Sequence, residues 1–104
     1  METLRIDNEE KYLVSLEKID KELHSIRRAL HSHNYEPTTH RLFRRLQTYR
    51  RHVELLRRRN DELIRSLRDH KEQGLGHLKS HMHSIIAFRK RIQRYRANLR
   101  GGRT

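Results

Sequence analysis

The chain has 104 residues, of which 37% are charged and 33% hydrophobic, and this composition predicts a single domain with a small core. It contains no apolar run approaching ~20 residues and no cysteine, which argues against membrane-spanning helices and excludes disulfides, thiolate zinc sites and cysteine nucleophiles. The 25 Lys and Arg residues against 13 Asp and Glu give a formal net charge of +12, so the expected partner is a polyanion or an acidic protein surface.

The positive charge increases along the chain. Residues 1–36 carry six basic and eight acidic side chains, residues 37–73 carry eleven and five, and residues 74–104 carry eight and none. Nineteen of the 25 basic residues are Arg, whose planar guanidinium groups form paired hydrogen bonds with phosphate or carboxylate. The last two-thirds of the chain therefore provide the candidate binding surface.

The first predicted helix covers residues 8–33, after a lead-in of residues 1–7. Its apolar residues lie alternately four and three positions apart, which is the spacing of one buried helix face. They are Tyr12, Leu16, Ile19, Leu23, Ile26 and Leu30. Asp7 and Glu10 have the spacing of a capping box at the start of this helix, and Pro37 lies beyond its end because proline cannot continue a helix.

The second predicted helix covers residues 38–73 and has a length of about 50 Å. Alternating steps of four and three define its buried face, which consists of Leu42, Leu46, Tyr49, Val53, Leu56, Asn60, Leu63, Leu67 and His70. In heptad notation Asn60 occupies an a position and Leu56 a d position. Gly74, followed by Leu75, is the predicted C-terminal cap.

The third predicted helix covers residues 77–100 and is followed by a flexible tail, residues 101–104. Its apolar residues are Leu78, Met82, Ile85, Phe88, Ile92, Tyr95 and Leu99. Two consecutive steps of three, from Met82 to Phe88, interrupt the heptad pattern, so this helix is expected to pack without a regular supercoil.

These elements predict an all-α fold, in which the first two helices form an antiparallel helical hairpin or coiled coil and the third helix is basic. Opposite charges favour this hairpin, with Asp20 near Arg50 and Glu22 near His52. The remaining apolar surface requires cover, either from the third helix in a three-helix bundle or from a second copy in a helical dimer.

A polar residue, Asn60, interrupts the apolar face of the second helix. Such a residue at an a position sets register and oligomeric state in parallel two-stranded coils, so one prediction is a homodimer. The predicted oligomer seam consists of Tyr49, Val53, Leu56, Asn60, Leu63 and Leu67. The alternative is that Asn60 lies at the solvated edge of a seam within one chain.

Four arginines repeat every seven residues on the face opposite that seam. Arg44, Arg51, Arg58 and Arg65 occupy successive f positions, about 10.5 Å apart. A face that is merely solvated usually mixes acidic and basic residues, whereas a row of Arg suits the phosphates of a nucleic-acid backbone. The predicted nucleic-acid contacts, including the basic cluster of the third helix, are Arg41, Arg44, Arg51, Arg58, Arg65, Arg68, Arg89, Lys90, Arg91 and Arg94.

The sequence contains no glycine-rich phosphate loop, no nucleophile motif and no pair of carboxylates suited to catalysis, so we predict neither an enzyme nor a cofactor. His77 and His81 are four residues apart and come nearest to a metal site, but a full ligand set at the required spacing is missing. No metal is therefore predicted. A pH-dependent charge is the more direct consequence of the nine histidines.

Together these features predict a small basic helical protein that binds nucleic acid through its phosphate backbone, independently of base sequence, with duplex RNA slightly favoured over DNA. The alternative is a non-enzymatic coiled-coil adaptor that docks its Arg-rich helices on an acidic protein, such as a cytoskeletal element or a complex subunit. The N-terminal residues resemble neither a secretory signal nor a mitochondrial presequence, so the cytoplasm or nucleus is the expected location.

Overall fold

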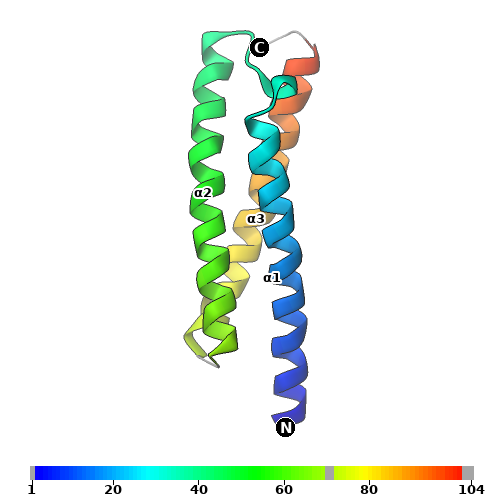
Figure 1. The fold of residues 1–104 in the computed structure, drawn as a ribbon, viewed down its shortest axis with the longest axis vertical. Helices are drawn as coiled ribbons and strands as arrows, with labels where there is room; N and C mark the ends of the chain where they lie inside the picture. Colours follow the sequence, from blue (N-terminus) through cyan, green and yellow to red (C-terminus); the bar gives the residue numbers. More distant parts are fainter. Residues whose placement is uncertain (1, 70–71, 102–104) are drawn as a thin grey trace.

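Three long helices lie side by side along one axis in the computed structural model, which describes residues 2–69 and 72–101 and the side chains of residues 10–69 and 76–100 (Figure 1). Helix α1 is Glu2–Leu30, α2 is His40–Arg68 and α3 is Glu72–Gly101, and a 3-10 turn, η1, covers His33–Tyr35. Consecutive helices run in opposite directions, and the molecule measures 55 × 19 × 19 Å (Figure 1). The predicted all-α class is confirmed, because the described residues contain no strand. None of the helices, over its described part, combines the length and hydropathy of a membrane span.

The core is formed by one face of each helix. Steps of three and four return side chains to the same side of an α-helix, so the buried positions form three facing stripes. The buried residues are Leu16, Ile19, Leu23 and Leu30 of α1, Leu42, Leu46, Tyr49, Val53, Leu56, Asn60, Leu63 and Leu67 of α2, and Leu78, His81, Ile85, Phe88, Ile92 and Tyr95 of α3. Tyr12, which the spacing placed on the buried face, is exposed.

Two helices begin at positions that differ from the prediction. Helix α1 starts at Glu2, so Asp7 lies inside the helix and not at a capping position. Helix α2 starts directly after Thr39, whose side chain accepts a hydrogen bond from the backbone N–H of Leu42 at 3.2 Å. Thr39 therefore caps α2, because this bond satisfies a donor that has no partner within the helix.

The chain also reverses earlier than predicted between α2 and α3. Asp69 follows the last residue of α2, and Gly74 lies inside α3, so the predicted helix cap at Gly74 is wrong. A glycine within a helix costs about 1 kcal/mol relative to alanine, and α3 is long enough to absorb this cost. Gly101 still belongs to α3, whereas Met1, His70 and residues 102–104 lie outside the described residues.

The first two helices pair in a different register from the predicted one. Arg50 donates from Nε to the backbone carbonyl of Leu30 at 3.0 Å, so Arg50 lies at the end of α1 and not beside Asp20. The reason is the connection, in which Tyr35 packs on Tyr95 of α3 with ring centroids 6.4 Å apart. The Tyr95 hydroxyl also donates to the Tyr35 carbonyl at 2.9 Å. The segment that connects α1 to α2 therefore extends alongside α3, past the end of α1. Helix α2 begins only after this segment.

Helix α3 has an unbroken pattern of buried positions. His81 is only 4% exposed, whereas Met82 is partly buried at the edge of the core. With His81 included, the steps between buried residues alternate between three and four from Leu78 to Tyr95. The predicted interruption is therefore wrong, because a polar side chain occupies a core position that apolar spacing does not reveal.

Candidate nucleic-acid interface

The predicted oligomer seam lies in the interior of one chain. All six of its residues are buried, and they are Tyr49, Val53, Leu56, Asn60, Leu63 and Leu67. Asn60 donates from Nδ2 to the carbonyl of Leu16 on α1 at 2.8 Å, and its Oδ1 lies 3.0 Å from Nε2 of His81 on α3. The alternative of a solvated Asn60 is therefore wrong. Helices α1 and α3 cover the seam of α2. A second copy of the chain therefore cannot bind to this face in this fold.

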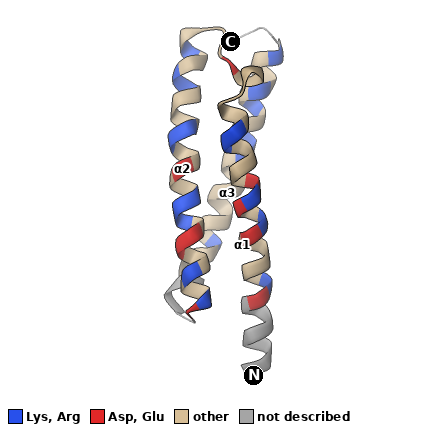
Figure 2. Ribbon diagram, viewed as in Figure 1, with Lys and Arg blue, Asp and Glu red and all other residues tan. Residues whose placement is uncertain are grey.

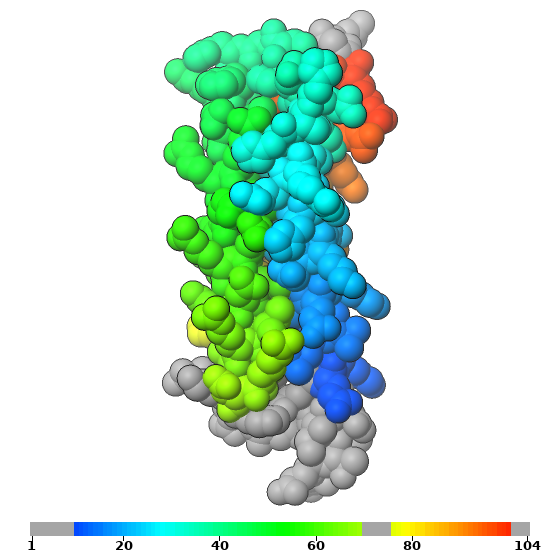
Figure 3. All heavy atoms as spheres, in the orientation of Figure 1, coloured from blue at the N-terminus to red at the C-terminus, as the bar shows by residue number. Residues whose placement is uncertain are grey.

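The arginine ridge, which consists of Arg44, Arg51, Arg58 and Arg65, lies on the outer surface of α2. All four side chains are exposed, and no carboxylate among the described side chains pairs with them. Basic residues recur along the length of α2 (Figure 2), and side chains project at intervals from its outer edge (Figure 3). The helix therefore presents a row of long cationic side chains to solvent.

Acidic residues divide the ridge into two unlike halves. Asp61 and Glu62 lie within about one helical turn of both Arg58 and Arg65, and Glu54 lies within one turn of both Arg51 and Arg58. By contrast, residues 37–53 contain no acidic residue. The uncompensated positive charge of α2 is therefore concentrated in its N-terminal half.

Antiparallel packing brings this half of α2 beside the C-terminal half of α3, which also contains no acidic residue (Figure 1). The rings of Tyr49 on α2 and Tyr95 on α3 meet edge-on, with centroids 5.7 Å apart. The Arg45 guanidinium lies 5.6 Å from the centroid of the same Tyr95 ring. We use the name basic end for six exposed cations of this region, which are Arg41, Arg44, Arg51, Lys90, Arg91 and Arg94.

His52 lies between α2 and α3 next to the basic end. Its ring meets Phe88 edge-on, with centroids 4.9 Å apart. Burial, followed by the charges of Arg91 and Arg59, lowers the pKa of His52 below its usual value of 6.5.

Two predicted nucleic-acid contacts, Arg68 and Arg89, do not join the basic end. Arg89 donates from Nε to Glu22 of α1 at 2.5 Å, so the predicted pairing of Glu22 with His52 is wrong. Arg68 lies 3.4 Å from Glu17 in the other half of the bundle. Both charges are partly compensated by a carboxylate, because α1 carries most of the acidic residues that face the other helices.

Two features near the basic end did not emerge from the sequence. Phe43 is 46% exposed beside Arg44, and its ring is nearly parallel to that of His40, with an interplanar angle of 17°. Arg45 donates from Nε to the Tyr49 hydroxyl at 3.3 Å, which holds its guanidinium against the bundle. The sequence did contain a signal for Phe43. This aromatic residue lies outside the spacing of the buried residues of α2 and directly precedes the arginine ridge.

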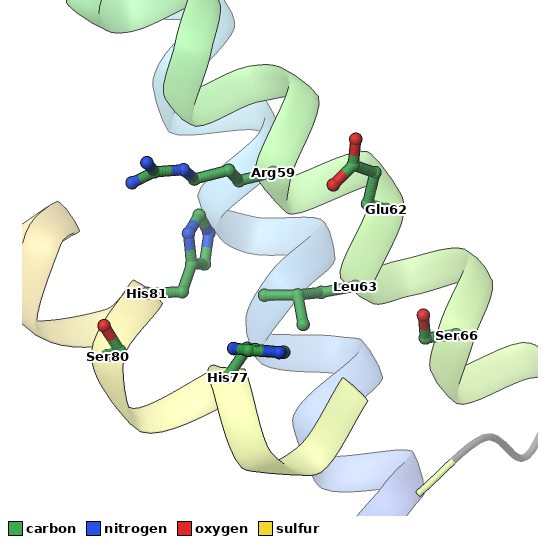
Figure 4. A pocket seen from close by; sticks show the side chains of 7 residues that line it. All are labelled: Arg59, Glu62, Leu63, Ser66, His77, Ser80 and His81. Carbon is green, nitrogen blue, oxygen red and sulfur yellow. The ribbon is translucent and has the colours of Figure 1, made fainter. Parts of the chain in front are cut away.

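A groove of about 480 Å³ lies between α2 and α3 in the half of the bundle away from the basic end (Figure 4). It is lined by Arg59, Glu62, Leu63, Ser66, His77, Ser80 and His81. Burial, reinforced by Arg59, lowers the pKa of His81 below its usual 6.5, and its buried Nδ1 has no hydrogen-bond partner. His77 and His81 both reach this groove, but within the described part of the chain no three metal-ligating side chains come together.

The basic end thus combines a helical scaffold, exposed Arg and Lys from two helices and two sequence segments, 37–53 and 74–100, that contain no acidic residue. Comparisons with protein-family models, curated proteins and solved structures gave no match to this chain. Charge and geometry are therefore the basis on which its function is inferred.

Proposed function

We propose that the protein binds nucleic acid through the phosphate backbone, without reading base sequence. The observation that carries this proposal is the basic end, where two neighbouring helices carry exposed cations in segments without acidic residues. Guanidinium groups on a rigid helix bind phosphate oxygens and release condensed counterions. The affinity then comes mainly from charge and falls steeply as salt rises.

Duplex RNA is the favoured form of nucleic acid in this proposal. The acid-free part of α2 after its N-cap, residues 40–53, is about 20 Å long and faces several successive phosphates of one strand. The exposed cations of the basic end are Arg and Lys, which suit the phosphates of the backbone. Proteins recognise A-form duplexes mostly by shape, through phosphates and 2′-hydroxyl groups.

Charge reversal at matched positions of the ridge tests the proposal. The variant Arg44→Glu/Arg51→Glu changes the acid-free half, and Arg58→Glu/Arg65→Glu makes the same change of charge in the acid-flanked half. We expect the first variant to bind an RNA duplex of about 20 base pairs at least about 30-fold more weakly, and the second to lose no more than about 5-fold. Fluorescence anisotropy at about 50 and 200 mM salt gives both affinities and the salt slope.

An equal loss in the two variants would mean that net charge alone drives binding, and no loss in either would refute the proposal. A DNA duplex of the same length is the second substrate, and equal affinity for both duplexes would remove the preference for RNA. Far-UV circular dichroism and sedimentation equilibrium serve as controls, because every substituted side chain is exposed and the fold should persist.

Docking on an acidic protein is the other function for which a cationic surface is suited. The adaptor hypothesis docks the Arg-rich helices on such a protein, whereas the coiled-coil seam that it also invoked is buried within one chain. A homodimer formed through the seam is therefore not part of this proposal. Arg dominates over Lys at the basic end, and guanidinium pairs with two oxygens of a phosphate or of a carboxylate alike, so the titrations with RNA and DNA duplexes distinguish the two kinds of ligand.

A further inference from the structure

We infer that Phe43 and His40 form a stacking site for an unpaired nucleotide beside the basic end. This inference rests on the proposed function, because the basic end holds the phosphates while the aromatic pair takes a base. The ligand class is accordingly a nucleic-acid duplex that carries a single-stranded extension.

Phe43 is exposed on the surface of α2. Phe43, Arg50 and Arg57 repeat every seven residues and therefore share one face of α2. Helix α1 covers this face at the two arginines, since Arg50 binds the carbonyl of Leu30 and an Arg57 nitrogen lies 3.5 Å from His24. Helix α1 ends at the level of Arg50, so none of the helices, as far as they are described, covers Phe43, and nearly half of the surface of this residue is exposed.

The rings of His40 and Phe43 have similar orientations. His40 and Phe43 lie one turn apart, with ring centroids separated by 6.4 Å and planes inclined by only 17°. His40 is also exposed. The two rings thus present similarly oriented π surfaces on one side of α2. A base stacks on such a surface whatever its identity, which agrees with binding that does not read sequence.

Positive charge surrounds the two rings, and this charge favours nucleic acid over a second copy of the chain as the bound partner. Arg41 and Arg44 lie next to the rings in the sequence, and both side chains are exposed. A second copy would bring a further +12 charge to this surface and would be repelled. A polynucleotide instead supplies a phosphate for each guanidinium and a base for each ring.

Two substrates that differ only in an overhang test this inference. One is a blunt RNA duplex of about 20 base pairs, and the other is the same duplex with a four-nucleotide 3′ extension that contains 2-aminopurine. We expect the wild-type protein to bind the extended duplex about 10-fold more tightly and to quench the 2-aminopurine fluorescence. Phe43→Leu keeps the apolar bulk and removes the aromatic face, so it should lose the preference and the quenching while binding the blunt duplex unchanged.

Tyr12→Leu is the matched control, because Tyr12 is another exposed aromatic residue but lies on α1 away from the basic end. This variant should retain both the preference and the quenching.

The inference is overturned if the wild type shows no preference, if Phe43→Leu retains the preference, or if Phe43→Leu weakens binding to both substrates equally. It is also overturned if Phe43→Leu dissociates a dimer in sedimentation equilibrium, since Phe43 would then contact a second copy. Failure of the proposed function appears differently, as an absence of blunt-duplex binding or as insensitivity to Arg44→Glu/Arg51→Glu.

Discussion

Asn60 of α2 and His81 of α3 meet in the interior of the bundle, with the amide Oδ1 3.0 Å from the imidazole Nε2. The Asn60 Nδ2 donates to the backbone carbonyl of Leu16 on α1 at 2.8 Å, so Oδ1 accepts the proton carried by His81 Nε2. One side chain of α2 thereby joins all three helices. Burial and the charge of Arg59 lower the pKa of His81, which favours the neutral imidazole, and among the described residues its buried Nδ1 has no hydrogen-bond partner.

Removal of the Asn60 amide is expected to destabilise the protein by about 2 kcal/mol, because Asn60→Ala leaves the Nε2–H of His81 unpaired in the core. Urea denaturation followed by circular dichroism measures this loss. Asp61→Ala is the matched control at the next residue, where the side chain is exposed, and it should change stability by less than about 0.5 kcal/mol. If Asn60→Ala is as stable as the wild type, the contact between the helices contributes nothing.

The free energy of unfolding is expected to fall as the pH drops below about 6.5. Burial and the charge of Arg59 place the pKa of His81 in the folded protein below the 6.5 of the unfolded chain. The unfolded state therefore binds more protons between these two pKa values, and stability decreases until folded His81 is itself protonated. The lowered pKa of His52 contributes a change of the same sign.

Urea midpoints measured between about pH 8 and 5 test this linkage. His81→Gln should flatten the profile, because glutamine retains an amide N–H donor for Asn60 and does not titrate. A wild-type midpoint that is constant across this range contradicts the prediction, as does a His81→Gln profile as steep as that of the wild type.

Nucleic-acid binding is expected to tighten as the pH falls from about 7 to 6. Burial and the charges of Arg91 and Arg59 lower the pKa of His52, and a phosphate bound at Arg91 would offset the positive charge and raise the pKa of this imidazole. Binding then takes up a proton, which favours the complex at lower pH. Anisotropy titrations at constant ionic strength should show a weaker pH dependence for His52→Gln, whereas His83→Gln, at an exposed site of α3, should resemble the wild type.

Two neighbouring arginines of α3 are expected to behave differently. Arg91→Gln should weaken nucleic-acid binding several-fold, since Arg91 belongs to the basic end. Arg89→Gln should leave binding within about 2-fold and reduce stability by no more than about 1 kcal/mol, because its partly exposed ion pair with Glu22 is screened by water. Anisotropy and urea denaturation of both variants measure these effects. An equal loss of nucleic-acid binding in the two variants would mean that the ion pair with Glu22 does not keep Arg89 out of the interface.

The apolar spacing correctly predicted the all-helical class and the buried face of α2, including the position of Asn60 between Leu56 and Leu63. The reason is geometric, because steps of three and four bring side chains to one side of a helix whatever covers that side. The same geometry placed the arginine ridge on the exposed side. His81 escaped prediction because a neutral buried histidine has no signature in an apolar pattern, and its partner Asn60 is 21 residues away.

The sequence by itself determined which helix faces are apolar and which segments lack acidic residues. Only the tertiary structure decided what covers each face and which arginines remain without a carboxylate. The packing of Tyr35 against Tyr95, 60 residues apart, carries the connection beyond the end of α1 and shifts α2 along α1. The packing of α1 beside α3 brings Glu22 to Arg89, whereas no ion pair among the described side chains joins a carboxylate to the basic end. Local spacing does not contain this information, because the register of each helix depends on contacts that all three helices make together.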